Sequence, residues 1–133
     1  GCELATDLDP DLPAIDADAT ALTHALRNLV SNAAIHGGRG APIHVRARHL
    51  GGAVEIDVCD QGPGIPPGEL GRVFDPFYRG RRARDNQTRG LGLGLSLVKR
   101  IIQAHGGSIA AANNPGPGAC FTVRLPAAKP TAA

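Results

Sequence analysis

The most regular hydrophobic pattern in the chain runs from Thr20 to His36. Its apolar residues recur every three or four positions, as on one face of a helix, namely at Leu22, Leu26, Leu29 and Ala33. Asp18 precedes this run and can cap a helix N-terminus, and two glycines follow it and can end the helix. The pattern therefore predicts an amphipathic helix that packs one face against a core.

Alternation of apolar and polar residues predicts strands in two neighbouring segments, 43–50 and 53–60. The Gly51-Gly52 pair between them is a hairpin signal, so these two strands should be antiparallel. Further strands are predicted at 108–112 and 120–125, around a turn rich in Asn, Pro and Gly. Two short extended segments, 2–6 and 14–15, precede the first helix.

A second amphipathic helix is predicted over residues 93–105, where Leu93, Leu97, Ile101 and Ala104 recur at helical spacing. Residues 69–74 predict one or two helical turns, and residues 75–90 predict an irregular basic segment. Strands on both sides of two long helices predict an α+β fold, with helices packed on one face of a mixed sheet.

Length and composition limit the possible functions. The chain has 133 residues, of which 42% are hydrophobic, which is enough for one domain with an aliphatic core. A net charge of +2 gives no general case for nucleic-acid binding. The sequence has neither an apolar run of membrane-spanning length nor a signal-peptide pattern, and it is typical of a cytosolic domain.

The three cysteines, Cys2, Cys59 and Cys120, are odd in number and form no CxxC motif. This arithmetic predicts neither a disulfide framework nor a zinc site. Cys59 and Cys120 fall in the predicted strands, where we expect them to be small buried hydrophobic residues.

A polar stripe runs beside the apolar face of the first helix. Asn28 and Asn32 are four residues apart, so both amides point the same way. Asparagine is a poor helix former, and an amide oxygen offered to a hard cation such as Mg²⁺ could account for the pair. The alternative is that both amides only satisfy a neighbouring loop. His36 lies on the same stripe, where it could stack on a base or be an ordinary surface histidine.

Asp60 ends a predicted strand and faces a glycine-rich turn that contains Gly62 and Gly64. Its carboxylate only accepts hydrogen bonds, and glycines beside it would let a flat ligand approach the backbone. The exocyclic amine of adenine suits such an acceptor, whereas guanine would leave the acid unpaired at a cost of about 1–3 kcal/mol. A turn of this kind without any ligand is an equally good interpretation.

The segment from Gly90 to Gly94 alternates glycine with leucine at the start of the second predicted helix. Amide groups at a helix N-terminus suit phosphate oxygens, although the spacing matches neither a Rossmann fingerprint nor a Walker loop. Five arginines precede it between Phe77 and Gly90. This stretch predicts either a solvated loop or a lid that closes on phosphates.

These motifs occur together and in one order, and in that combination the chain resembles the ATP-binding catalytic domain of bacterial sensor histidine kinases. RNLVSNAAIH is similar to the N box, DQGPGIP to the G1 box, VFDPFYRG to the F box and RGLGLGLSLVKRI to the G2 box. The resemblance implies a Bergerat-type two-layer α/β sandwich, with about five strands and three helices packed on one face. Residues 1–126 would form this domain, and residues 127–133 a disordered tail.

The resemblance also implies roles for individual residues. Asn32 would bind Mg²⁺ with Asn28 assisting, and Asp60 would hold the adenine amine. Phe74 and Phe77 would anchor the lid, and Arg79 would reach the γ-phosphate or the acceptor domain, so that Asn28 and Arg79 are the catalytic candidates. The remaining candidates would line the nucleotide site: His36, Gly62, Gly64, Ile65, Gly90, Leu91, Gly92, Leu93, Gly94 and Leu95.

The sequence departs from the family pattern at several positions. Ile35 stands where a basic residue is usual, Leu91 where a small hydroxyl residue is usual, and Ala119 where Ser or Thr is common. Hydrolytic members of the superfamily carry Glu where this chain has Asn28. Because an amide is not a general base, this difference favours phosphoryl transfer over efficient hydrolysis.

The implied reaction is transfer of the γ-phosphoryl group of ATP to a histidine. None of the histidines here has the sequence context of the family's acceptor, so the acceptor is expected on a separate helical-hairpin domain. The chain would then be a cytoplasmic fragment of a longer, dimeric, membrane-bound kinase, touching the membrane only through its missing N-terminal part and signalling to a cognate response regulator. The alternative from another class is a nucleotide-binding docking module, similar to anti-sigma regulators.

Overall fold

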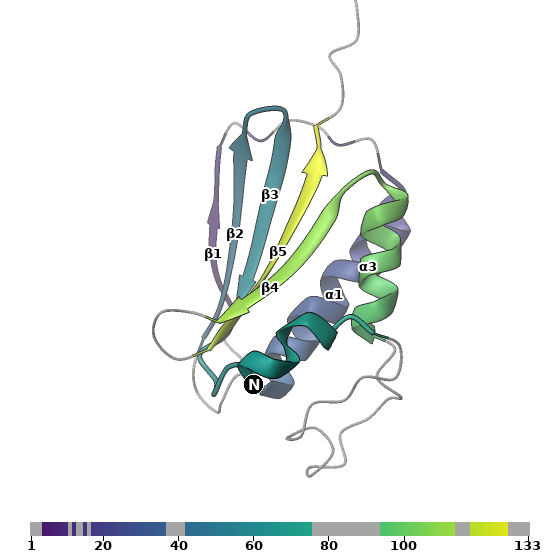
Figure 1. Cartoon of the computed structure of the whole chain (residues 1–133). Coiled ribbons are helices and arrows are strands. Elements are labelled where there is room, and N and C mark those ends of the chain that lie inside the picture. The colour runs from purple at the N-terminus through teal and green to yellow at the C-terminus, as the bar shows by residue number, and fades with distance from the viewer. Residues whose placement is uncertain are drawn as a thin grey trace, which may run out of the picture.

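A five-stranded mixed sheet organises the molecule (Figure 1). The computed structural model describes residues 4–10, 12, 15, 17–36, 42–75, 94–113 and 118–127. The strands are β1 (Leu4–Leu8), β2 (Ile43–Leu50), β3 (Ala53–Cys59), β4 (Ser108–Asn113) and β5 (Ala119–Pro126). The helices are α1 (Ala19–His36), the 3₁₀ helix η1 (Pro67–Arg72) and α3 (Gly94–Ala104). The predicted α+β fold is confirmed.

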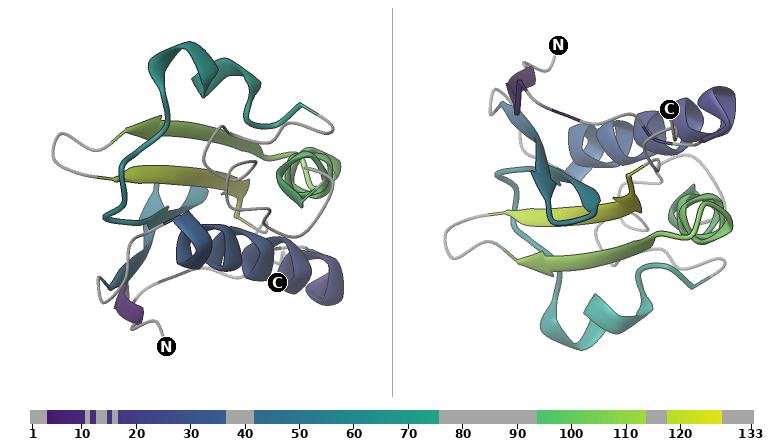
Figure 2. Two further views of the ribbon diagram at one scale, coloured as in Figure 1. Left: turned by 90° about the horizontal axis from the view of Figure 1, so that it is seen from below. Right: turned by 90° about the horizontal axis from the view of Figure 1, so that it is seen from above.

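The strand order is β1-β2-β3-β5-β4. Strand β1 runs parallel to β2, and the other neighbouring pairs are antiparallel. The glycine pair makes the predicted β2–β3 hairpin, with Gly51 at φ 60°. Helices α1 and α3 cover one face, whereas η1 lies beyond the β4 edge, as both views in Figure 2 show.

Helix α1 begins and packs as its sequence predicts. The Ala21 N–H donates a hydrogen bond to Asp18 Oδ1 over 3.1 Å, which is an N-cap. Ala25, Leu29 and Ala33 are buried in the core. They belong to one core cluster with buried residues of the central strands: Val58 of β3, and Phe121, Val123 and Leu125 of β5.

The buried face of α3 differs from the predicted one. Val98 and Ile102 are fully buried, whereas Leu97 is 38% exposed and Ala104 lies at the surface. The apolar arc of this helix is wide, and its centre passes through Leu95, Val98 and Ile102. The predicted residues that the structure describes, Leu97, Ile101 and Ala104, lie at the edge of that arc, so apolar spacing alone identified the wrong buried face.

His105 joins the end of α3 to the start of α1. Its Nε2 lies 3.0 Å from the Asp18 backbone nitrogen, and its Nδ1 lies 2.7 Å from the Ile101 carbonyl oxygen. A backbone N–H can only donate, so Nε2 accepts and Nδ1 carries the proton that it donates to Ile101. The ring thereby satisfies one free backbone group at each helix end.

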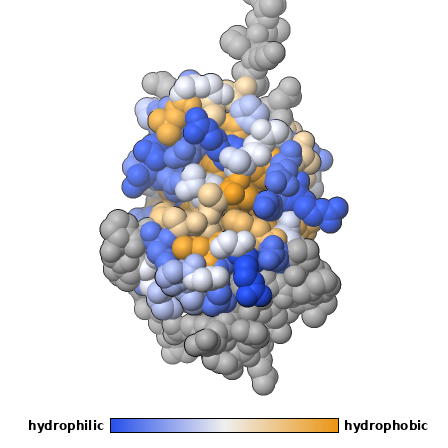
Figure 3. All heavy atoms as spheres, in the orientation of Figure 1, coloured by the Kyte–Doolittle hydropathy of each residue, from blue (hydrophilic) through white to orange (hydrophobic). Residues whose placement is uncertain are grey.

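The face of the sheet away from the helices, here called the open face, is charged. Arg48 lies 3.0 Å from Glu55 and 3.4 Å from Asp57, and Thr122 donates a hydrogen bond to Asp57 over 2.7 Å. Figure 3, seen in the orientation of Figure 1, shows hydrophilic residues on both flanks of the molecule, with an apolar band between them. Half-exposed ion pairs of this kind contribute little stability, and they suit a surface that faces water.

Across the described residues, no helix is long and apolar enough to span a bilayer.

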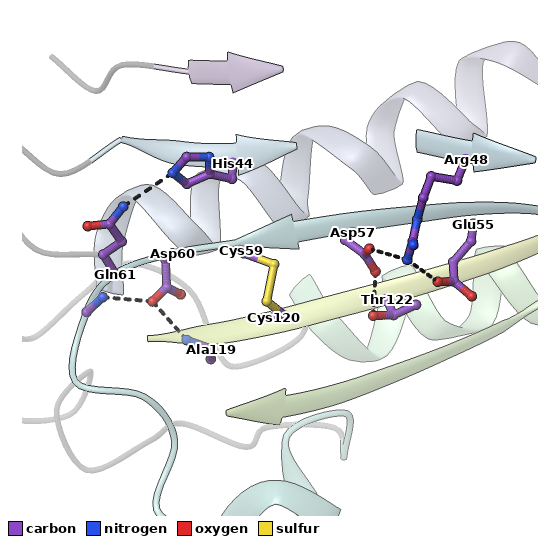
Figure 4. The surroundings of a disulfide bond; sticks show 11 residues. His44, Arg48, Glu55, Asp57, Cys59, Asp60, Gln61, Ala119, Cys120 and Thr122 are labelled. Carbon is purple, nitrogen blue, oxygen red and sulfur yellow. Dashed lines mark hydrogen bonds and ion pairs between the residues drawn. A yellow bond between two sulfur atoms is a disulfide. The ribbon is translucent and has the colours of Figure 1, made fainter. Parts of the chain in front are cut away.

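A disulfide joins Cys59 and Cys120, so the expectation of two unpaired cysteines is wrong (Figure 4). The two residues are directly opposite each other in the β3–β5 register. The Asp60 N–H bonds to the Ala119 carbonyl, so the adjacent Cys59–Cys120 pair is a non-hydrogen-bonded one, in which side chains approach most closely. Cysteine counting failed because this pairing depends on register between residues 61 positions apart.

The Cys59→Ser substitution should lower the free energy of unfolding by about 4 kcal/mol, because the disulfide closes a long loop in the unfolded chain. Urea unfolding of oxidised protein measures the loss, and Cys2→Ser is the matched control because Cys2 has no part in this bond. Adding dithiothreitol should reduce the stability of the parent to that of Cys59→Ser. An unfolding midpoint that is insensitive to reduction would contradict the assignment.

Candidate functional site

Four chain segments converge at one end of the molecule, the lower end in Figure 1. Strand β3 ends there at Cys59 and leads into Asp60, and the C-terminal half of α1 lies there with Asn28 and Asn32. Helix η1 and the N-terminus of α3 reach the same end. Polar residues that the sequence places far apart are therefore brought to one edge of the fold.

Asp60 is the buried acid of this edge, with only 4% of its surface exposed. Its Oδ1 accepts hydrogen bonds from the backbone N–H of Gly62 over 2.9 Å and of Ala119 over 3.2 Å. Figure 4 draws these two bonds to Oδ1. The Asp60 N–H in turn donates to the Ala119 carbonyl oxygen over 2.9 Å. The backbone thus fixes the carboxylate, and burial without such bonds would be costly.

Gly118 allows β5 to approach Asp60, and sequence reasoning missed it. Its φ is +104°, a conformation that side chains rarely adopt, and a Cβ there would lie 1.9 Å from the Asp60 carbonyl oxygen. In the sequence, Gly118 is the second glycine of the run Gly116-Pro117-Gly118, which is typical of a turn. That pattern predicted a turn and did not predict the close approach of Gly118 to the Asp60 backbone.

Asn113 is a second residue that sequence reasoning did not assign to the site. Its side-chain amide bonds to the backbone N–H and carbonyl of Ile65, over 2.7 and 2.8 Å. Ile65 itself, a predicted site residue, is half-buried against the core. Gly62 and Gly64, also predicted, lie between Asp60 and this contact. The structure therefore brings the G1-type residues together.

Asn28 and Asn32 are both half-buried on α1. Among the described residues neither side chain has a hydrogen-bond partner, and the neighbouring segments 37–41 and 76–93 lie outside those residues. The described ranges also contain no group of three or more His, Cys, Asp or Glu that could hold a metal. The donors available at this edge are neutral amide oxygens, which suit Mg²⁺ when phosphates supply further ligands.

Phe74 links η1 to the sheet and to α3. Its ring meets the Phe121 ring edge-on at 6.0 Å, and Lys99 Nζ lies 5.7 Å from its centre. The preceding Val73 is buried in the core. Helix α3 begins at Gly94, and the next residue, Leu95, packs against the same core. The start of the segment similar to the F box is thereby held beside α3, which begins within the segment similar to the G2 box.

Several predicted site residues lie outside the described residues: Phe77, Arg79, Gly90, Leu91, Gly92 and Leu93. The backbone of His36 closes α1, and its side chain belongs to the same group. Their assignments stay predictions.

The order and spacing of these elements match a known family of ATPases. The family model for histidine kinase-, DNA gyrase B- and HSP90-like ATPases matches residues 17–129. The chain belongs to this ATPase family. Within the family, the chain is similar to sensor histidine kinases, as its relatives and structural neighbours show.

Among curated relatives, the sensor-like histidine kinase SenX3 from Mycobacterium tuberculosis is 43% identical over 125 residues, which cover 94% of this chain and 30% of SenX3. The mycobacterial sensor histidine kinase MprB has a TM-score of 0.86 at 33% identity, covering 95% of this chain and 84% of that one. Full-length ShkA in complex with AMPPNP has a TM-score of 0.82 at 33% identity, covering 99% and 27%. The histidine kinase ATPase fold expected from the sequence is confirmed.

The Gly118→Ala substitution should lower the free energy of unfolding by at least about 2 kcal/mol, because the methyl group would overlap the Asp60 carbonyl oxygen. Gly52→Ala is the matched control, since a Cβ there meets nothing within 4 Å. Thermal or urea unfolding measures both. Equal losses in the two variants would show that Gly118 is not pressed against Asp60.

Proposed function

We propose that this domain binds ATP with Mg²⁺ and donates the γ-phosphoryl group to a histidine on a separate phosphoacceptor domain. The observation that carries this proposal is the buried Asp60 carboxylate, held by backbone N–H groups at the edge where α1, η1 and α3 converge. Membership of the histidine kinase-like ATPase family supports it. The complex of the similar protein ShkA with AMPPNP, an ATP analogue, also supports it.

Asp60 would select adenine by its hydrogen-bonding character. The carboxylate only accepts, and the exocyclic amine of adenine donates, so the two are complementary. Guanine presents an oxygen at the same position and would face the carboxylate with a second acceptor. Gly62 and Gly64 leave room beside the acid for a flat base, and the half-buried Ile65 offers it an apolar contact.

Asn32 would hold Mg²⁺ through its side-chain oxygen, and Asn28, one helical turn away, would assist at the metal or the phosphates. Mg²⁺ would neutralise the negative charge that the phosphates carry. The two amides fit a site in which the nucleotide supplies most of the ligands, because the described residues offer no acidic cage.

The phosphates would lie at the N-terminus of α3. Backbone N–H groups there face the end of the helix without intrahelical partners, and Gly94 is its first residue. We assign Gly90, Leu91, Gly92, Leu93 and Leu95 to the same site, with Phe77 and His36 at its borders. Arg79 would stabilise charge on the γ-phosphate. Asn28 stands where hydrolytic relatives carry a general base, which favours transfer over hydrolysis.

The acceptor histidine would come from another part of the same kinase. The chain spans 30% of SenX3, so the remaining length of such relatives leaves room for a dimeric helical acceptor domain. The partners would be that domain and a cognate response regulator, and the membrane would be reached only through segments outside this chain. Nucleic acid is not a proposed partner, because the net charge is only +2.

A docking module that binds nucleotide without phosphoryl transfer is the second candidate. Ile35 and Leu91 favour it, since both replace side chains that would otherwise contact phosphate. Addition of a helical acceptor domain in trans separates the two candidates. Phosphohistidine formation supports the kinase, and its absence despite tight ATP binding leaves the module.

The Asp60→Asn substitution should weaken ATP binding about ten- to hundredfold, because it turns an acceptor into a group that can oppose the adenine amine with N–H donors. Asp57→Asn is the matched control, since Asp57 belongs to the ion pairs of the open face. Isothermal titration calorimetry with AMPPNP measures both. Unchanged affinity in Asp60→Asn would contradict the role of the acid.

The Asn32→Ala substitution should leave adenine recognition intact and abolish the gain in affinity that Mg²⁺ gives. The reason is that the amide oxygen acts on the metal, whereas the base is held at Asp60. Titration of AMPPNP with Mg²⁺ and with EDTA measures the gain. A variant in which Mg²⁺ still strengthens binding as in the parent would exclude Asn32 as the ligand.

A further inference from the structure

The loop that follows Asp60 is held by one side chain from a distant strand. Asn113, the last residue of β4, bonds to both backbone polar groups of Ile65, 48 positions away. The Ile65 N–H donates to Oδ1 over 2.7 Å, and Nδ2 donates to the Ile65 carbonyl oxygen over 2.8 Å. The amide pairs donor with acceptor in both directions, as a neighbouring strand would.

The composition of this loop leaves it few other ways to be fixed. Residues 63, 66 and 67 are proline and have no N–H group. Gly62 donates its N–H to Asp60 at one end of the loop, and Ile65 donates its N–H to Asn113 at the other. The acid and the amide are thus the two anchors of the same short segment.

The backbone between these anchors is shaped for the contact. Gly64 has φ +82°, and a Cβ there would lie 2.8 Å from Asn113 Oδ1. Asn113 is paired in register with Ala119, whose N–H donates to Asp60 Oδ1. One pair of strand residues therefore supports both Asp60 and the loop beside it.

We propose that Asn113 is a positioning residue for the nucleotide base. By holding Ile65, it keeps the segment from Gly62 to Ile65 at the spacing from the Asp60 carboxylate that adenine requires. This inference rests on the proposed ATP binding and deepens it, since it assigns base selectivity to a residue that touches no nucleotide. Asn113 would affect recognition of the base and would leave the contacts with Mg²⁺ and the phosphates unchanged.

The test compares Asn113→Ala with Gln61→Ala in the intact chain. Gln61 is a matched control, because it is an amide of the same loop whose side chain contacts His44 on the open face instead. Binding of ATP, GTP and inorganic triphosphate is measured with Mg²⁺ by calorimetry. Asn113→Ala should weaken ATP binding about tenfold, because two hydrogen bonds are lost, and should lower the ATP-to-GTP preference by a similar factor. Triphosphate binding should not change, and Gln61→Ala should bind all three ligands like the parent.

Amide hydrogen exchange in the ligand-free protein supplies an independent readout. The Ile65 amide should be protected in the parent and should lose protection in Asn113→Ala, while amides of β5 and α3 keep theirs and show that the variant is folded. An unprotected Ile65 amide in the parent would overturn the proposal.

The binding outcomes separate this proposal from the proposed function. A parent that does not bind ATP refutes both. A parent that binds ATP, together with an Asn113→Ala variant of equal affinity and selectivity, refutes the positioning role alone. Equal loss of ATP, GTP and triphosphate binding also refutes it, because a general disturbance would have that effect.

Discussion

A carboxylate that is almost removed from water has to be surrounded by donors, and in this molecule that requirement falls on Asp60. Burial of an ionised acid without hydrogen bonds would cost several kcal/mol, more than most single contacts in a domain contribute. The backbone N–H groups of Gly62 and Ala119 meet the requirement. They come from two segments, so the acid is held only when the β3 end and the β5 start are both in place.

The surrounding structure brings those two strands together at that point. The disulfide joins Cys59 to Cys120, one residue before Asp60 and one after Ala119. Gly118 lets the β5 backbone approach where any side chain would overlap the Asp60 carbonyl oxygen. The open face of the sheet carries ion pairs around Arg48 and faces water. The candidate site therefore lies at the strand ends, where backbone donors surround Asp60, and not on the broad surface of the sheet.

Much of this architecture was predictable from local pattern. Helix α1, its Asp18 cap and the β2–β3 hairpin depend on residues close together in sequence, and all three were predicted correctly. Asp60 was singled out from its place between a strand and a glycine turn; the structure shows that it is buried, and its role in binding adenine stays a prediction. The family resemblance, carried by four motifs in order, was confirmed by the family match.

The rest depended on contacts between residues far apart in sequence. The Cys59–Cys120 bond needs the β3–β5 register, which no count of cysteines reveals. The hydrogen bonds between Asn113 and Ile65 join the last residue of β4 to a loop 48 positions away, and no local sequence pattern indicates such a contact. The buried row of α3 was wrong because a wide apolar arc contains several helical rows, and packing against the sheet decides which is central.

The most direct test of the account is an NMR titration of the amide groups with AMPPNP, with and without Mg²⁺. We expect the largest shift changes at the backbone amides of Gly62 and Ala119, which donate to Asp60, and changes at the Asn32 side-chain amide only when Mg²⁺ is present. Changes centred on Asp57 and Thr122 of the open face, with Gly62 and Ala119 unaffected, would contradict it.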